Sequence, residues 1–406
     1  LGKGSISGVL AALDWVMANR LTYNVKVVNL SLGAPAVSTY TSDPLCKAVR
    51  RLVDAGLVVV TAAGNDGKDA NGQKLYGAIH SPGNEPSAIT VGATNTFGTN
   101  SRGDDQVASY SSSGPTRSYR TDAAGLKHYD NFIKPDLVAP GNKLIAAEAV
   151  NNYLVTQNPS LETGLGSHKP NEQMMYLSGT SGAAPAVAGA AALLLQANPQ
   201  LTPNMVKMIL MYTAQQLSGF NTLQQGAGAL NMEGAIRLAK LVRTNLPATP
   251  ALGTQLLTTS TGPVSQSTID GTTFQWAQGI IMDQTFARGS DLITKYQKIY
   301  ARGVLLSDGT LFNNGVLLSD STMMSSGVLL SDNILTSSGV LLGDGYIFLS
   351  CGVLLGDGVL LSDGVLLGDG RVISDGVLLA DGVLMGDGVL LGDVRAKAWQ
   401  VMVNGD

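Results

Sequence analysis

Short apolar runs that alternate with helical patterns constrain the fold of this chain more than any other feature of its sequence. The runs Val27–Leu32 and Leu57–Ala62 are strongly apolar, and the helical patterns Ile6–Asn19 and Pro44–Ala55 precede them. Strands that alternate with helices in this way predict a parallel sheet with helices on both faces. The sequence therefore predicts an α/β fold for this part of the chain.

Small residues follow or end both predicted strands. Because the carboxyl ends of parallel strands meet at one edge of a sheet, where ligands bind, we expect these residues to border a single cleft. Glycine lets a peptide backbone approach closely, and free strand-edge groups there could pair with an extended substrate. The predicted substrate-binding residues are Ser31, Leu32, Gly33, Ala62, Ala63 and Gly64.

The segment Ser178–Pro185 places Ser181 between small residues just before an apolar stretch. A serine mounted in this way shows its hydroxyl to a substrate with little obstruction, as nucleophiles do. Proline fits only near the start of a helix, so Pro185 predicts a helix that begins close to Ser181. The unpaired N–H groups of the first turn would favour negative charge that develops beside the serine.

The apolar run Gly182–Ala197 contains Gln196 as its single polar residue. It is shorter than the roughly 20 residues that span a bilayer, so we expect a buried central helix and no membrane span. The pair Thr202-Pro203 predicts the start of a second helix, which continues through Ala214.

The segment around Ser181 resembles the nucleophile motif of the subtilisin-like serine peptidases, the subtilases (peptidase family S8). Three further segments match that family in the same chain order. Val28–Gly33 is similar to the strand that lines the substrate cleft, Val58–Asn65 to the strand that ends at the oxyanion-hole asparagine, and Lys134–Gly141 to a structural segment that leads towards the nucleophile. The resemblance covers residues 1–243.

The resemblance implies a serine endopeptidase that acts through an acyl-enzyme. Ser181 would be the nucleophile, and the side chain of Asn65 would stabilise the oxyanion together with the Ser181 backbone N–H. It further implies a polypeptide substrate, no cofactor, and a secreted or cell-surface location in a bacterium. In this family the bond Ser81-Pro82 is a candidate for the cis form, although trans is the expectation from the sequence alone.

A serine nucleophile needs a base, which this family supplies as a histidine oriented by an aspartate. Since the order in the family is Asp, His, Ser, the matching residues should lie upstream of Val28, and Leu1 reads as an arbitrary start. We expect His80, His128 and His168 to be solvated loop residues. The 406-residue chain alone is then expected to be inactive. The alternative is a noncatalytic binding or structural protein, in which a degenerate peptidase domain presents the C-terminal repeats.

Residues 244–300 read as a linker or irregular strands, and a hexapeptide array follows at 301–393 before a tail at 394–406. The unit Gly-Val-Leu-Leu-Ser/Gly-Asp begins at Gly303 and returns at Gly315, Gly327 and Gly339, with diverged hexads between these copies. Each unit is too small to fold alone, so the array must stack or meander.

Two architectures fit the repeats. One is an antiparallel meander that turns at every Asp-Gly pair; the other is a flat β-solenoid with two hexads per coil, which the twelve-residue spacing favours. The array could serve as a spacer or as a contact to a surface or matrix. Calcium needs several oxygen ligands that converge on one point, and one Asp per hexad suits turn chemistry better, so we predict no metal.

Composition limits the remaining classes. The chain has 406 residues, 44% of them hydrophobic and 14% charged, with a net charge of −4. This is enough apolar material for a large core and for two to three units, whereas nothing indicates a basic surface for nucleic acid. The two cysteines, Cys46 and Cys351, lie in different units and need no disulfide. The sequence as a whole predicts an N-terminally incomplete, subtilisin-like α/β domain followed by a β-rich repeat module.

Overall fold

The computed structural model describes residues 4–296, with thirteen exceptions, and short strands between residues 310 and 384. The exceptions are residues 122, 124, 126, 167, 168, 170, 171, 248, 249, 251, 252, 283 and 284. His168 and Cys351 therefore lie outside the described residues, as does the side chain of His128.

The centre of the fold is a parallel sheet, as the alternating pattern predicts. Its strands run in the order β1-β3-β5, with β9 parallel to β5 and the short β6 antiparallel to it. The strands are β1 (Val27–Leu30), β3 (Val58–Ala62), β5 (Ile89–Asn95), β6 (Gln106–Val107) and β9 (Leu137–Pro140). Every residue of β3 and β5 is buried, and in β3 this burial explains an apolar run that only Thr61 interrupts.

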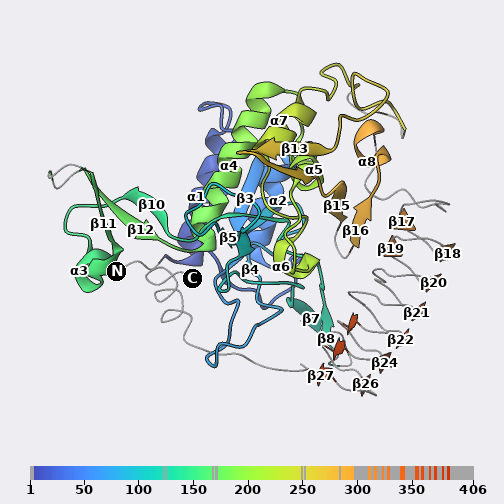
Figure 1. The fold of residues 1–406 in the computed structure, drawn as a ribbon, viewed down its shortest axis with the longest axis horizontal. Coiled ribbons are helices and arrows are strands. Elements are labelled where there is room, and N and C mark those ends of the chain that lie inside the picture. Colours follow the sequence, from blue (N-terminus) through green and yellow to red (C-terminus); the bar gives the residue numbers. More distant parts are fainter. Residues whose placement is uncertain are drawn as a thin grey trace.

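Helices cover both faces of this sheet (Figure 1). Alternation along β3 divides the core, since Val58 and Val60 pack in the cluster that contains α4 residues, whereas Val59 packs with residues of α1 and α2. The helices of the two layers are α1 (Ile6–Asn19) and α2 (Pro44–Asp54) on one side, and α4 (Thr180–Ala197), α5 (Pro203–Thr213) and α7 (Met232–Ala239) on the other.

Side-chain caps determine where the helices begin. Ser5 accepts a hydrogen bond from the Gly8 N–H and starts α1, whose bounds equal those predicted. Asp43 and Thr202 cap α2 and α5 in the same way, each followed by a proline at the first helical position. α2 and α5 each end one residue before their predicted ends.

α4 is the buried central helix that the sequence predicts, but only one of its faces is buried. Its buried positions recur every three or four residues, from Thr180 to Leu194, while Leu193 is 47% exposed. By length and composition α4 could cross a membrane, but 39% of it is buried inside the protein, where it packs on β3 and β5 of the central sheet. The helix begins at Thr180, close to Ser181 as Pro185 predicts.

Residues 244–296 pack more closely than a linker would. Trp276 is 3% exposed and stacks edge to face against Tyr212 of α5. Ile280, Ile281 and Met282 lie in the same core cluster as α5. The paired strands here are β13 (Gln266–Ile269) with β14 (Thr272–Gln275), and β15 (Gly279–Met282) with β16 (Thr285–Arg288).

Within the repeats, the described strands pair in parallel. Gly315 lies opposite Gly327, which lies opposite Gly339, a step of twelve residues; Val340 then pairs with Val353 across one extra residue. A second set runs from Gly358 through Gly370 to Gly382. The strands of the first set are β18 (Gly315–Leu317), β20 (Gly327–Leu329), β21 (Gly339–Leu342), β22 (Val353–Leu355), β24 (Val365–Leu366) and β26 (Val377–Leu378). The other two sheets pair β17 (Thr310–Leu311) with β19 (Thr322–Met323), and β23 (Gly358–Leu360) with β25 (Gly370–Val372) and β27 (Gly382–Leu384).

The remaining elements are short. They are β2 (Ala34–Pro35), β4 (His80–Ser81), β7 (Tyr119–Thr121), β8 (Lys127–Tyr129), β10 (Leu144–Ala147), α3 (Tyr153–Gln157), η1 (Pro159–Leu161), β11 (Glu162–Gly166), β12 (Gln173–Leu177), α6 (Thr222–Gln225) and α8 (Asp291–Thr294). Of these elements β12 is the most important for the site, because it ends at Leu177, just before α4 begins at Thr180.

Candidate functional site

Ser181 is mounted on a sharp turn between β12 and α4. Gly179 precedes the helix with a φ of +149°, a backbone conformation that favours glycine, and a Cβ at this position would lie 3.3 Å from the Asn65 amide nitrogen. Ser181 itself is exposed, and within the described part of the chain its hydroxyl has no hydrogen-bond partner. The turn therefore presents a free hydroxyl at the first turn of a helix.

Asn65 lies beside this turn with its amide orientation fixed. Its Oδ1 accepts hydrogen bonds from the Thr180 backbone N–H at 2.9 Å and from the Thr180 hydroxyl at 3.0 Å. An amide nitrogen cannot accept these protons, so the Asn65 Nδ2 group must face away from Thr180. No other described residue holds that NH₂ group. The arrangement leaves a half-buried donor beside Ser181.

Thr180 organises the site, although the sequence analysis gave it no role. It is fully buried, and its hydroxyl also lies 3.2 Å from both the N–H and the carbonyl oxygen of Gly64. Thr180 thus joins the nucleophile turn to the end of β3. The only signal in the sequence was its place directly before Ser181, since its partners lie 115 and 116 residues away.

The predicted cleft residues are brought to the same place. The Ser31 hydroxyl donates to the Ser181 backbone carbonyl oxygen at 2.7 Å, so the end of β1 contacts the start of α4. Leu32 and Gly33 are exposed next to it, whereas Ala62, Ala63 and Gly64 are buried. The structure therefore places both predicted segments next to the turn that carries Ser181. The first segment contacts it through the Ser31 side chain, and the second through the Gly64 backbone, which contacts Thr180.

His80 is not the solvated loop histidine that the sequence analysis expects. Its side chain is 12% exposed, and its Nε2 lies 2.6 Å from Asp66 Oδ2. A Cβ at Gly33 would lie 2.8 Å from the His80 Cβ, and one at Gly64 would lie 2.9 Å from its Cδ2. The imidazole thus fills the space between the two predicted cleft segments. Among the described residues no hydrogen bond joins it to Ser181.

Three peptide bonds in this part of the chain are cis. Ser81-Pro82, directly after His80, is one of them, so the trans expectation from the sequence was wrong and the family comparison pointed to the right form. Gly114-Pro115 and Lys134-Pro135 are also cis, and no sequence argument indicated either.

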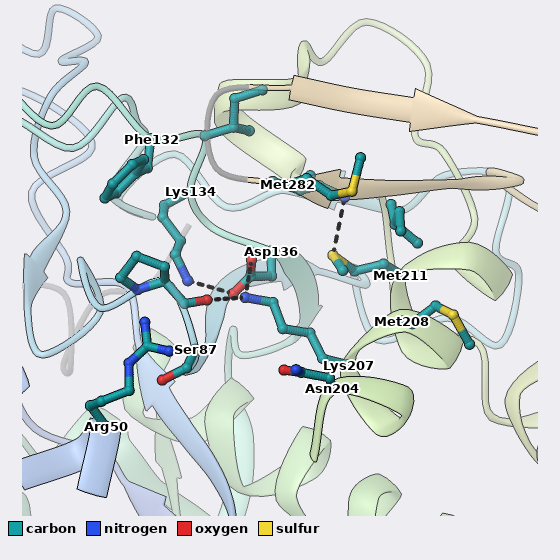
Figure 2. Close-up of a pocket in the computed structure, with 14 residues that line it drawn as sticks. Arg50, Ser87, Phe132, Lys134, Asp136, Asn204, Lys207, Met208, Met211 and Met282 are labelled. Atoms are coloured by element: carbon teal, nitrogen blue, oxygen red, sulfur yellow. Dashed lines mark hydrogen bonds and ion pairs between the residues drawn. The ribbon is translucent and has the colours of Figure 1, made fainter. Parts of the chain in front are cut away.

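A cavity of about 160 Å³ lies elsewhere, and Figure 2 shows the charged residues on its wall. Lys134 donates to Asp136 Oδ2 at 2.7 Å, to the Ala88 carbonyl at 3.0 Å and to Thr90 Oγ1 at 2.9 Å. Lys207 contacts Asp136 Oδ1 at 2.9 Å and the carbonyls of residues 86 and 88 at 2.7 and 2.9 Å. Lys134 therefore uses all three of its ammonium protons, whereas Lys207 makes two hydrogen bonds and one ion pair, because Asp136 Oδ1 has no hydrogen-bond partner among the described residues.

Burial dominates the electrostatics of this charged cluster. It lowers the pKa of Lys134 to about 8, against the opposing attraction of Asp136. Burial alone would raise the pKa of Asp136, but the charges of Lys134 and Lys207 outweigh it and lower that pKa. The three charged groups contact one another and, through the two ammonium groups, nearby backbone carbonyls, so the cavity is bordered by a structural ion cluster. Among the described residues, no group of three or more His, Cys, Asp or Glu could hold a metal ion.

An exposed serine at the start of a helix lies here beside a free amide donor at the end of a parallel strand, an arrangement typical of α/β serine hydrolases. The model of the subtilase family matches residues 2–235 of this chain. The chain belongs to that family.

Similar proteins carry names that agree with this assignment. Serine protease AprX of Bacillus subtilis (strain 168) is 35% identical over 244 residues, which are 58% of this chain and 49% of AprX. The extracellular serine proteinase of a Thermus species (strain Rt41A) is 35% identical over 213 residues, 52% of this chain and 38% of that protein. The chain thus spans about half or less of these relatives. A solved protease from Pseudoalteromonas arctica PAMC 21717 is 25% identical, with a TM-score of 0.36 over 53% of this chain and 51% of its own.

Proposed function

We propose that this chain carries the nucleophile and the oxyanion site of a serine endopeptidase. The Ser181 hydroxyl would attack the carbonyl carbon of a peptide bond and form an acyl-enzyme, which water then hydrolyses. The Asn65 Nδ2 group and the Ser181 backbone N–H would donate to the developing oxyanion, assisted by the positive end of the α4 dipole. The observation that carries this proposal is the fixed Asn65 amide, whose Oδ1 is held by Thr180 at 2.9 Å.

The base for Ser181 would come from residues outside this chain. Within the described residues, the one histidine with a placed side chain, His80, is engaged with Asp66. Exposed apolar side chains on α1 and α4, the helices on either side of β1, support this proposal. Trp15 of α1 is 55% exposed and Leu193 of α4 is 47% exposed, while β1 forms an open edge of the sheet between these two helix layers. We propose that further strands and helices, which hold the catalytic histidine and aspartate, cover this surface.

The substrate would be a polypeptide bound in an extended form. Its backbone would pair beside Ser31, Leu32 and Gly33, where β1 ends next to Ser181. Ala62, Ala63 and Gly64 would form the opposite side, with His80 and Asp66 between the two segments. No cofactor is needed for this chemistry.

Two assays on purified protein test the proposal. The 406-residue chain should neither hydrolyse a peptide mixture nor react with a fluorophosphonate at Ser181. A longer protein that includes the preceding coding sequence should do both. Hydrolysis by the 406-residue chain would overturn the proposal that the base for Ser181 lies outside it. Failure of the longer protein to react would favour a noncatalytic protein with a degenerate peptidase domain.

We further propose that the repeats form a β-solenoid with two hexads per coil, as a spacer or a contact to a surface or matrix. The parallel pairing of described strands at a twelve-residue step supports this architecture over an antiparallel meander. A location outside the cell, secreted or at its surface, is proposed by analogy with the relative named as an extracellular serine proteinase.

A further inference from the structure

Pro185 leaves one carbonyl of α4 without its helical partner. In an α-helix the N–H of each residue donates to the carbonyl four residues earlier. Pro185 has no N–H, so the carbonyl oxygen of Ser181 receives no such bond. This oxygen belongs to the nucleophile residue itself, and its hydrogen bond must come from outside the helix.

The Ser31 hydroxyl supplies that bond at 2.7 Å. Its own direction is fixed, because Asn29 Nδ2 donates to the Ser31 oxygen at 2.9 Å. A hydroxyl has one proton, so the Ser31 proton is left for the Ser181 carbonyl. On the other side of the same peptide unit, the Gly182 N–H donates to the Gly179 carbonyl at 2.9 Å. The peptide plane that follows the nucleophile is therefore held at both its N–H and its C=O.

We propose that Ser31 is a positioning residue for the nucleophile, in addition to bordering the substrate. Fixing the peptide plane after Ser181 fixes the ψ angle of Ser181, and with it the direction of the Cα–Cβ bond that carries the hydroxyl. The strand segment beside which a substrate would pair is thereby tied to the backbone of the residue that attacks it. The kinetic part of this inference rests on the proposed peptidase function.

The kinetic test uses the longer, active protein. Ser31→Ala should lower kcat about three- to tenfold, the effect of one neutral hydrogen bond, with KM changed less than about twofold. Ser31→Thr keeps the hydroxyl and should retain most of kcat. Ser260→Ala makes the same change at an exposed position without a hydrogen-bond partner and should have no effect. A change in KM alone would overturn the proposal, because Ser31 would then act only on the substrate.

A second test does not depend on activity. Pro185→Ala restores an N–H that can donate to the Ser181 carbonyl and compete with Ser31. In urea unfolding of the 406-residue chain, Ser31→Ala should shift the midpoint less in the Pro185→Ala background than in the natural one. Equal shifts in both backgrounds would show no coupling and would overturn the inference.

The two tests separate this inference from the proposed function. If the longer protein is inactive and unreactive, the peptidase proposal fails, while the unfolding cycle still decides whether Ser31 and Pro185 are coupled. Coupled unfolding with an unchanged kcat in Ser31→Ala would also overturn the positioning role, since the bond would then be structural only.

Discussion

Two polar clusters in this molecule differ in how completely their hydrogen bonds are used. Around the Lys134–Asp136–Lys207 cluster, each ammonium has three oxygen partners within 3.0 Å and all three side chains are nearly inaccessible. Around Ser181, one hydroxyl and one amide NH₂ group are left without partners in the described structure. The charged groups beside the cavity are therefore paired with one another, and the cluster with free donors is the one suited to chemistry.

Unused hydrogen-bond donors therefore distinguish the two clusters more clearly than cavity volume does. Buried charges must be paired to be tolerated, so the pairing of Lys134 and Lys207 with Asp136 accounts for this cluster without a ligand. Free donors that neighbouring hydrogen bonds hold in place can stabilise a negative charge that develops only during a reaction. The following variants test this contrast, from the largest expected effect to the smallest.

Ser181→Ala in the longer, active protein should lower kcat by about 10⁴-fold or more, because the attacking group is removed. Since the Ser181 hydroxyl has no partner within the described residues, the free energy of unfolding should change by less than about 0.5 kcal/mol. Peptide hydrolysis and urea unfolding measure the two quantities. A large loss of stability would contradict the view that this hydroxyl is free.

Asp136→Asn should give the opposite pattern. It leaves two buried ammonium groups without their counter-ion, which should cost about 3 to 5 kcal/mol in the free energy of unfolding. Asp54→Asn makes the same change at an exposed position and serves as the control. Equal stability of the two variants would contradict the structural role of the cluster.

The difference in stability between the natural protein and Asp136→Asn should also depend on pH. The pKa of Asp136 lies below its ordinary value of 3.8, so its carboxylate stabilises the folded state above about pH 4 and this contribution is lost as the pH falls further. The stability gap between the natural protein and Asp136→Asn should therefore narrow below about pH 4. Unfolding curves recorded between pH 7 and pH 3 measure it; a gap that widens on acidification would refute the assignment.

Asn65→Ala should lower kcat about 10²- to 10³-fold, because one donor to the oxyanion is removed. KM should change little, since the oxyanion forms only on the way to the acyl-enzyme. Asn71→Ala, at an exposed position nearby, is the matched control. Steady-state kinetics on a peptide substrate measure kcat and KM for both variants. A change in KM alone would exclude an oxyanion role for Asn65.

The smallest effect is expected for Arg51→Ala. Arg51 pairs with Asp14 at 2.7 Å, but both side chains are more than half exposed, so the loss should be below about 0.5 kcal/mol. The neighbouring Arg50 pairs with Glu85, which is 1% exposed. Arg50→Ala should therefore cost more than Arg51→Ala in the same urea titration, and the reverse order would count against burial as the deciding factor.

Much of the fold could be predicted from the sequence because its signals are local. Capping residues and apolar periodicity determine where α1, α2 and α5 begin, and the structure confirms the predicted starts. Residues 244–296 were harder to interpret. Their polar composition conceals Trp276 and Ile280, whose burial depends on contacts with α5 rather than on any local pattern.

The site was predictable to the extent that its residues stand in short motifs. Ser181, Asn65 and Ser31 were identified in this way, and the structure brings them together; their catalytic roles stay predictions. The environment of His80 could not be predicted, because its partner Asp66 belongs to a different loop and only the fold makes them neighbours. The exposed face of α4 was missed for a similar reason, since its sequence is apolar all round.

The twelve-residue step between paired repeat strands has a genetic consequence. Where Gly315, Gly327 and Gly339 lie opposite one another, duplication or loss of one twelve-residue unit would keep every remaining pair in register. Each such event would lengthen or shorten the stack by about 4.8 Å, the distance between neighbouring strands. Loss of six residues would instead exchange the two sets of strands. A whole unit of twelve residues is therefore the change in length that this pairing tolerates without a shift of register.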